Sequence, residues 1–189
     1  MNMRILSALA GVAGAALSSI PAQAAITVLG GGPAQFCYRA ADEALPPRDF
    51  IAYCDQALMT SLSPADRAAT YINRGVLRLA MKNLDGANQD FNAALAINDK
   101  LGEAYVNRGA TLIAKGQYAE GLLDLNRGLA LGTSEAHLAY YDRAIASEAL
   151  GNLRGAYDDY RMALTLQPNF EPASNQLKRF KIVDSPNGT

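Results

Sequence analysis

An aromatic residue, an amide or acid, an arginine and a very small residue recur three times along this sequence. The copies read YINRG, YVNRG and YYDRA, and their arginines are Arg74, Arg108 and Arg143. Arginines repeated in this way could bind three phosphate or carboxylate groups, because a guanidinium group pairs with such anions through two parallel hydrogen bonds. They could equally form ion pairs inside a repeated packing unit. The choice depends on the elements that carry them.

Three blocks, 68–101, 102–135 and 137–170, align around these arginines. Each block has a tyrosine at its fourth position and very small residues at its eighth, twentieth and twenty-seventh positions. The small residues are Gly75, Ala87 and Ala94, then Gly109, Gly121 and Gly128, then Ala144, Ala156 and Ala163. Two antiparallel helices approach closely only where their side chains are small. Each block therefore predicts one helix pair.

The segments YINRGVLR…ANQDFNAAL, YVNRGATL…GLLDLNRGL and YYDRAIAS…AYDDYRMAL resemble the tetratricopeptide repeat (TPR) family over residues 68–170. Three copies in register make the resemblance specific. It implies an all-α fold, a right-handed superhelical solenoid of antiparallel helix pairs. The sequence departs from the family pattern where each copy has arginine in place of leucine, and only the last copy ends in the expected proline, Pro168.

Flanking segments extend the array to about nine helices. Residues 33–67 predict a helical hairpin, a degenerate repeat with helices over Pro33–Leu45 and Arg48–Ser61, because the residue before a proline is pushed out of the helical region. Residues 171–182 predict a C-terminal capping helix that covers the last apolar surface, and residues 183–189 a loose tail.

The N-terminal segment 1–24 has the composition of a secretory signal peptide. One cation, Arg4, precedes an apolar run, and the segment ends in Ala22-Gln23-Ala24, a small-x-small cleavage site. An uncleaved membrane anchor is the alternative, but the apolar run is shorter than a membrane span. We therefore expect a periplasmic or secreted protein with no stable membrane anchor after cleavage, and a linker over residues 25–32.

Export favours a disulfide between the two cysteines, Cys37 and Cys54, because an oxidising compartment permits it. If the two predicted hairpin helices fold back on each other about Pro46-Pro47, the cysteines lie at similar heights. The alternative is a pair of buried free thiols.

Several functional classes are disfavoured by the composition. The formal net charge is −1, and no basic stripe for nucleic acid is present. The only histidine is His137, so we expect no metal site, and we expect no cofactor. The chain lacks the H-x-x-x-H, C-x-x-C and G-x-S-x-G patterns of common catalytic sites. We therefore do not expect an enzyme.

In the TPR family the first helix of each pair lines a concave groove. The resemblance implies that groove residues here include Asn73, Val76, Val106, Asn107, Ala110, Tyr141, Asp142 and Ile145. The groove would be largely apolar, with a polar row at the two asparagines and the aspartate. An asparagine amide both donates and accepts, so it can pair with the backbone of a bound peptide. The alternative is that the N-terminal hairpin fills part of this groove.

Each repeat also carries an aspartate at matching depth in its second helix. We predict structural ion pairs, and no anion site, between Arg74 and Asp90, Arg108 and Asp124, and Arg143 and Asp159. The function expected from these features is an interaction scaffold in the cell envelope that binds an unknown protein or peptide in its groove. A redox-responsive or chaperone-like assembly helper in the periplasm is the alternative.

Overall fold

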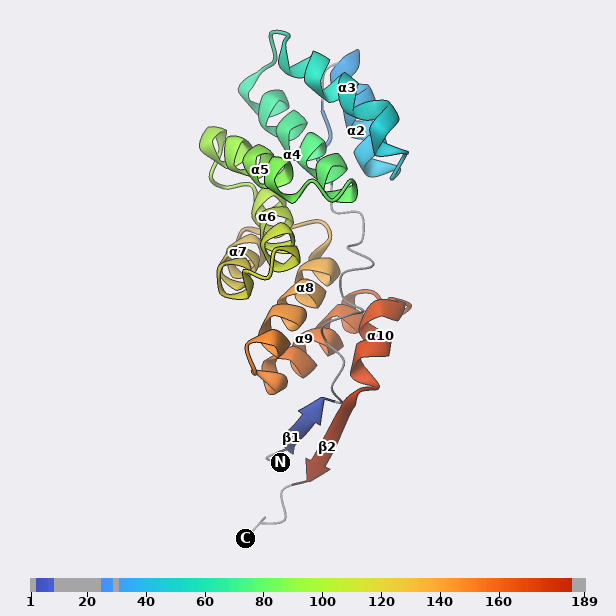
Figure 1. The fold of residues 1–189 in the computed structure, drawn as a ribbon, viewed down its shortest axis with the longest axis vertical. Coiled ribbons are helices and arrows are strands. Elements are labelled where there is room, and N and C mark those ends of the chain that lie inside the picture. The colour runs from blue at the N-terminus through green and yellow to red at the C-terminus, as the bar shows by residue number, and fades with distance from the viewer. Residues whose placement is uncertain (1–2, 9–24, 29–30, 185–189) are drawn as a thin grey trace.

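The computed structural model describes residues 3–8, 25–28 and 31–184 of the chain. This part contains nine helices, which stack along the long axis of the molecule (Figure 1). Their bounds are α2 Pro33–Asp42, α3 Pro47–Leu58, α4 Pro64–Ala80, α5 Leu84–Ile97, α6 Gly102–Ala114, α7 Tyr118–Leu131, α8 Ala136–Ala149, α9 Leu153–Leu166 and α10 Glu171–Leu177. The predicted all-α solenoid of helix pairs is confirmed.

Tight turns join the two helices of each repeat. The turns of the three repeats place Lys82, Gly116 and Gly151 in the left-handed region, with φ of 60°, 77° and 82°. Glycine adopts this conformation without strain, and it ends a helix abruptly so that the chain can reverse. In the first and third repeats an asparagine then caps the second helix: the side chains of Asn83 and Asn152 accept the backbone N–H groups of glycines three residues on.

Small residues set the spacing within each pair, as the sequence pattern predicts. A Cβ atom built on Gly109 of α6 would lie 2.9 Å from the Leu125 side chain and 3.0 Å from the carbonyl oxygen of Gly121 on α7. On Gly75 it would lie 2.5 Å from the ring of Phe91. The helices are therefore close enough that a larger side chain at these positions would force them apart.

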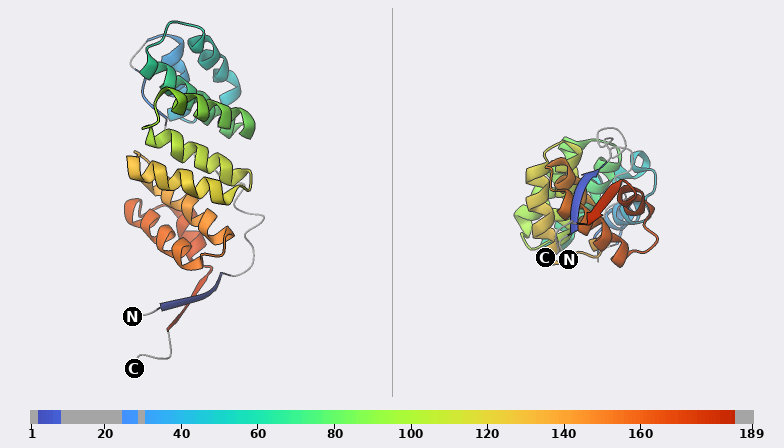
Figure 2. Two further views of the ribbon diagram at one scale, coloured as in Figure 1. Left: turned by 90° about the vertical axis from the view of Figure 1, so that its left-hand side faces the viewer. Right: turned by 90° about the horizontal axis from the view of Figure 1, so that it is seen from below.

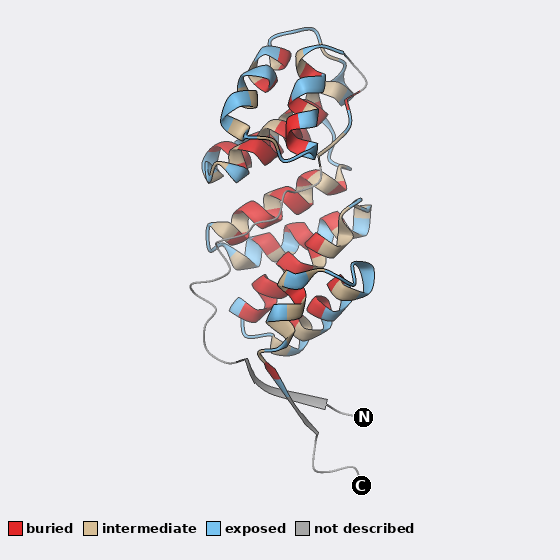
Figure 3. Ribbon diagram, turned by 90° about the vertical axis from the view of Figure 1, so that its right-hand side faces the viewer, coloured by how far each residue is buried: buried red, intermediate tan, exposed pale blue. Residues whose placement is uncertain are grey.

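The pairs form successive layers of one stack (Figure 2). Adjacent layers contact each other through α3 and α4, α5 and α6, and α7 and α8. Buried residues follow the stack through its length (Figure 3), because each layer covers the apolar surface of its neighbour.

The N-terminal hairpin forms, with helices shorter than predicted. The first helix ends at Asp42 and not at Leu45, because Ala44 turns into the left-handed region with a φ of 50°. The second begins at Pro47 and ends at Leu58 and not at Ser61. Ser63 caps the next helix, α4, by accepting the N–H of Asp66 at 3.1 Å, which sets the start of the first full repeat.

The C-terminal end differs from the prediction. The capping helix α10 ends at Leu177, and not at 182, and the chain continues as strand β2 over Phe180–Asp184. The sequence after the helix, FKIVD, contains two adjacent β-branched residues, which favour an extended chain. Strand β2 pairs in antiparallel register with β1, Met3–Ala8. The predicted tail therefore begins within a strand, and its residues 185–189 lie outside the described part.

Strand β1 falls within the segment that the sequence predicts as a signal peptide. The remainder of that segment, residues 9–24, lies outside the described residues, as do residues 29–30 of the predicted linker.

Candidate functional site

The repeated arginines pair with the predicted aspartates in all three repeats. Arg108 on α6 donates to Asp124 on α7 through Nε at 2.7 Å and Nη2 at 2.8 Å. Arg143 on α8 holds Asp159 on α9 in the same way, at 2.8 and 2.7 Å. Arg74 makes the equivalent contact with Asp90, whose second oxygen also accepts from Arg78 at 2.8 Å.

The third nitrogen of each guanidinium group reaches back to the preceding repeat, a contact that sequence reasoning missed. Nη1 of Arg74, Arg108 and Arg143 donates to Asp55, Asn92 and Asn126 respectively, at 2.7, 2.7 and 2.9 Å. Asn92 and Asn126 lie 34 residues apart, so their shared position in the repeat was the available signal. Each arginine thus joins three helices, and its donors are used within the protein rather than on a ligand.

The tyrosine three residues before each arginine stacks on its guanidinium group. The distances from Cζ to the ring centroid are 5.5 Å for Arg74 on Tyr71, 5.3 Å for Arg108 on Tyr105 and 5.0 Å for Arg143 on Tyr140. The hydrogen bond with Asp124 raises the pKa of Arg108 despite its partial burial, and Asp159 does the same for Arg143. These arginines are structural cations.

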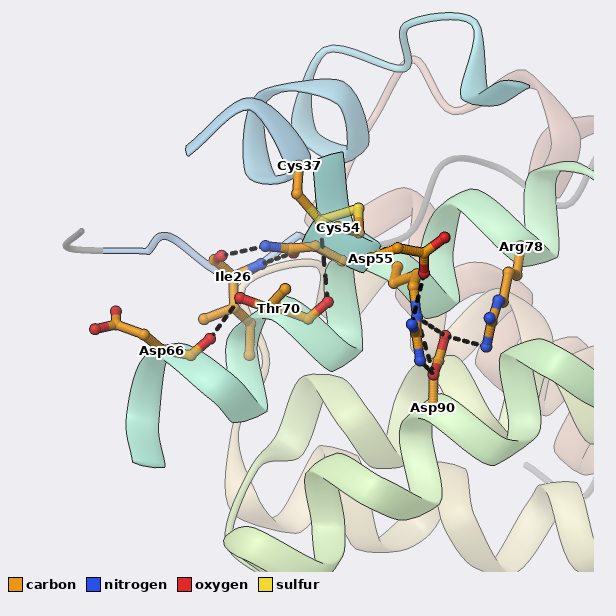
Figure 4. The surroundings of a disulfide bond; sticks show 10 residues. Ile26, Cys37, Cys54, Asp55, Asp66, Thr70, Arg78 and Asp90 are labelled. Atoms are coloured by element: carbon orange, nitrogen blue, oxygen red, sulfur yellow. Dashed lines mark hydrogen bonds and ion pairs between the residues drawn. A yellow bond between two sulfur atoms is a disulfide. The ribbon is translucent and has the colours of Figure 1, made fainter. Parts of the chain in front are cut away.

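Cys37 on α2 and Cys54 on α3 form a disulfide, with a Cα–Cα distance of 4.9 Å (Figure 4). Both residues are fully buried. The bond closes the hairpin beside Asp55, the residue through which α3 binds Arg74. The disulfide is therefore next in sequence to the ion pair that attaches the hairpin to the first full repeat.

Asn73 on α4 binds the backbone of Ile26 through both functions of its amide. The Ile26 N–H donates to Asn73 Oδ1 at 2.8 Å, and Asn73 Nδ2 donates to the Ile26 carbonyl oxygen at 2.8 Å. An asparagine in the groove is expected to pair in this way, as both donor and acceptor, with the backbone of a bound peptide. Here the chain's own N-terminal segment supplies the backbone.

The eight residues predicted to line the groove, which we call the inner face, lie on α4, α6 and α8, and all eight are buried. Asn73 is covered by residues 25–28, which precede the hairpin. The sequence left filling of the groove by the N-terminal hairpin as the alternative to an open groove. The groove is covered at this point, but by the segment before the hairpin. Because all eight residues are buried, the inner face is not an open groove in the folded chain, and at the first repeat residues 25–28 supply the cover.

The third repeat has an acid where the first two have an asparagine. Asp142 is 5% exposed, and its Oδ2 atom has no hydrogen-bond partner in the part of the chain that the structure describes. Burial raises the pKa of Asp142 to about 7. The neighbouring Tyr141 ring packs edge-on against Phe170 at 5.2 Å, and burial raises the pKa of its hydroxyl as well.

Glu148, nearly two turns of α8 beyond Asp142, is also buried, but it is paired. Its carboxylate accepts from Arg179 at 2.7 Å and from the hydroxyl of Tyr160 at 3.2 Å. Of the two buried acids on α8, Asp142 is therefore the one whose carboxylate lacks a compensating charge.

A cavity of about 410 Å³ lies away from the inner face, between α9, α10 and β2, and is lined by Tyr157, Arg161, Leu164, Thr165, Leu177 and Phe180. Within residues 3–8, 25–28 and 31–184 no cluster of three or more histidine, cysteine or acidic side chains could hold a metal ion. Among the helices described, none is long and apolar enough to span a bilayer.

No protein-family model and no curated protein matches this sequence. Solved structures match its fold. The type IV pilus biogenesis factor PilW has a TM-score of 0.68 at 23% identity, over 78% of this chain and 66% of its own. The TPR domain of Arabidopsis OM64 has a TM-score of 0.58 at 22% identity, over 62% and 96%. The first TPR domain of Spaghetti (RPAP3) bound to the HSP90 peptide SRMEEVD has a TM-score of 0.56 at 25% identity, over 59% and 88%.

Proposed function

From its fold, a helical solenoid of the tetratricopeptide repeat type, we propose that this chain is a non-enzymatic scaffold that binds a peptide or protein segment on its inner face. The observation that carries this proposal is the pairing of Asn73 with both backbone groups of Ile26. The inner face there holds a non-helical stretch of chain by backbone hydrogen bonds. Such bonds give affinity for a segment regardless of its side chains.

The structural neighbours support a protein partner. One of them, the RPAP3 domain, is bound to a peptide with two glutamates and a C-terminal aspartate. The inner face defined above contains no lysine or arginine, so it lacks the cations that would hold such an acidic peptide end. We therefore propose a partner segment that is recognised through its backbone and its apolar side chains.

We further propose that the scaffold works in the cell envelope. The predicted signal peptide over residues 1–24 supports this location. The disulfide between Cys37 and Cys54 supports it independently, because such bonds persist in oxidising compartments and are rare in the cytosol.

A random-peptide library displayed on phage tests the binding function. We expect selected peptides to bind the purified chain and to lose affinity about tenfold or more when Asn107→Ala and Tyr141→Ala are combined, since both residues lie on the inner face. Leu123→Ala is a surface control, because Leu123 on α7 is 68% exposed and outside the inner face, and circular dichroism checks that the double variant, whose two sites are buried, stays folded. If no peptide is selected, or if the control weakens binding equally, the proposal is wrong.

The alternative of a redox-responsive helper is less favoured by the structure. A switch requires that a reductant reach the disulfide, and both cysteines are fully buried. The disulfide is better explained as a staple of the hairpin.

A further inference from the structure

Residues 25–28 occupy a built site between the hairpin and the first full repeat. Val28 is 6% exposed and packs with Ala34 of α2, Ala57 of α3 and Ala69 of α4. Ile26 packs against the same cluster and against the neighbouring core, whereas Thr27 between them is exposed. Alternate side chains of this segment therefore point into the protein.

The protein binds the backbone of the same segment at one residue, Ile26. The two hydrogen bonds between Ile26 and Asn73, each 2.8 Å long, satisfy a donor and an acceptor of one peptide residue together. Figure 4 shows Ile26 beside α4, near the disulfide that closes the hairpin. The site thus combines an amide that recognises any backbone with an apolar wall that selects side chains.

We propose that this is an exchangeable peptide site, that residues 25–28 are its resident ligand, and that the partner is an uncharged extended segment with aliphatic side chains at alternate positions. This inference rests on the proposed function and specifies its ligand. Small alanines form the wall and leave room for β-branched side chains such as those of Ile26 and Val28. A charged side chain directed at this wall would be buried without a partner, at a high cost in free energy.

Exchange is feasible because the resident segment belongs to no helix or strand. Between it and α2 lie Gly31 and Gly32, which have open space around them. A short tether gives residues 25–28 an effective concentration of roughly millimolar order at their site, so a partner must overcome that competition. The apparent affinity for a partner is the intrinsic affinity multiplied by the fraction of molecules in which the site is empty.

The experiment uses the full chain and a defined probe, the peptide Ala-Ile-Thr-Val-Leu-Gly with a fluorescent label, whose binding is measured by anisotropy. Ile26→Pro removes the N–H that Asn73 accepts, so it should weaken the binding of residues 25–28 to their site. We expect this variant to bind the probe about tenfold or more tightly than the unmodified chain does. Thr27→Pro is the matched control, because it places the same residue at an exposed position.

Adding Asn73→Leu to Ile26→Pro should abolish the gain, because leucine has a similar size but cannot form the two hydrogen bonds. Circular dichroism would establish that each variant is folded. Equal affinity of Ile26→Pro and the unmodified chain for the probe would overturn the inference, as would a gain that survives Asn73→Leu.

A measurement on the unmodified chain does not depend on any substitution. Saturating probe should accelerate hydrogen exchange at the Ile26 amide, because the resident leaves Asn73; a scrambled peptide should not. Unchanged exchange at saturating probe would also overturn the inference. If peptides selected from the random library bind but this probe does not, the inference fails while the proposed function stands.

Discussion

At the residue scale, the repeated arginine acts as a joint between helices. Its planar group binds the aspartate of its own repeat with two nitrogens and the preceding repeat with the third, and a tyrosine covers its face. The three donors of a lysine sit on one nitrogen, so they could not bind both oxygens of the aspartate in parallel and also reach the preceding repeat. This explains why arginine stands where the family has leucine: the long side chain packs between helices and also satisfies a buried acid.

Arg108→Met tests this role. The substitution keeps an apolar stem but leaves Asp124, which is 9% exposed, without its cation, so we expect the free energy of unfolding to fall by about 2–3 kcal/mol. Arg154→Met is the matched control, because its pair with Asp158 is exposed, and it should cost under about 0.5 kcal/mol. Denaturant unfolding measures both; equal losses would contradict the assignment.

Asp142 predicts a pH dependence of stability. Its pKa is raised from 3.8 to about 7, so between these values the folded chain binds a proton that the unfolded chain has released. Stability therefore falls as the pH rises from about 4 to about 7, by at most about 4 kcal/mol, and levels off above.

Asp142→Asn should remove this loss, because an amide has no charge to bury. The variant should be as stable as the unmodified chain near pH 4 and more stable near pH 8, as measured by urea unfolding. Asp99→Asn is the control, since Asp99 is exposed, and it should leave the pH profile unchanged. A parallel profile for Asp142→Asn and the unmodified chain would contradict the argument.

At the element scale, the hairpin of α2 and α3 is the part of the stack that most needs a covalent link. Among the described helices its main neighbour is α4, and its own two helices are short. The cysteines are 17 residues apart, and closing a loop of that length stabilises a fold by about 3 kcal/mol. The bond also holds Asp55 in place for Arg74.

Replacing both cysteines by alanine should therefore unfold the hairpin locally. We expect hydrogen exchange to accelerate in α2 and α3 while α6 to α9 keep their protection, because repeats are stabilised mainly by their nearest neighbours. In the unmodified chain, a thiol reagent under native conditions should find no reactive cysteine. Rapid reduction of the native disulfide would instead favour the redox-responsive role.

The last full repeat lacks the acceptor that links the earlier repeats. The position that holds Asn92 and Asn126 in earlier repeats is Arg161 in α9, which stacks on Tyr157 at 5.8 Å. An arginine there cannot accept a hydrogen bond from a further repeat's arginine. In place of such a repeat, the short helix α10 covers α9, with Ala173 fully buried.

At the scale of the whole molecule, the predicted signal peptide lies directly before the segment that covers the inner face. Cleavage after Ala24 would leave Ala25 as the first residue, directly before the segment that Asn73 binds. It would also remove β1 and leave β2 without its present partner strand. The mature chain would thus carry the resident ligand of its inner face at its very N-terminus.

Expression in a bacterium with an envelope tests this expectation. Mass spectrometry of the exported protein should give a chain that begins at Ala25. Replacing Ala22 and Ala24 by leucine should block processing, because the peptidase requires small residues at these two positions. A full-length chain in the periplasmic fraction, or a chain retained in the cytosol, would refute the predicted location.

The sequence by itself determined the helix pairs, the contacts at small residues and the arginine–aspartate pairs, and it favoured a disulfide over two free thiols. These features repeat at a fixed interval or lie within one hairpin, so the pattern of residue types is enough to locate them. Only the tertiary structure decided that residues 25–28 lie on the inner face, that each arginine reaches the preceding repeat, and that the last helix stops at Leu177. Ile26 and Asn73 are 47 residues apart, and their contact involves the backbone of Ile26, which leaves no trace in the sequence. The opening motif therefore contributes three architectural residues in each repeat, and in the first repeat its asparagine, Asn73, binds a peptide segment supplied by the protein itself.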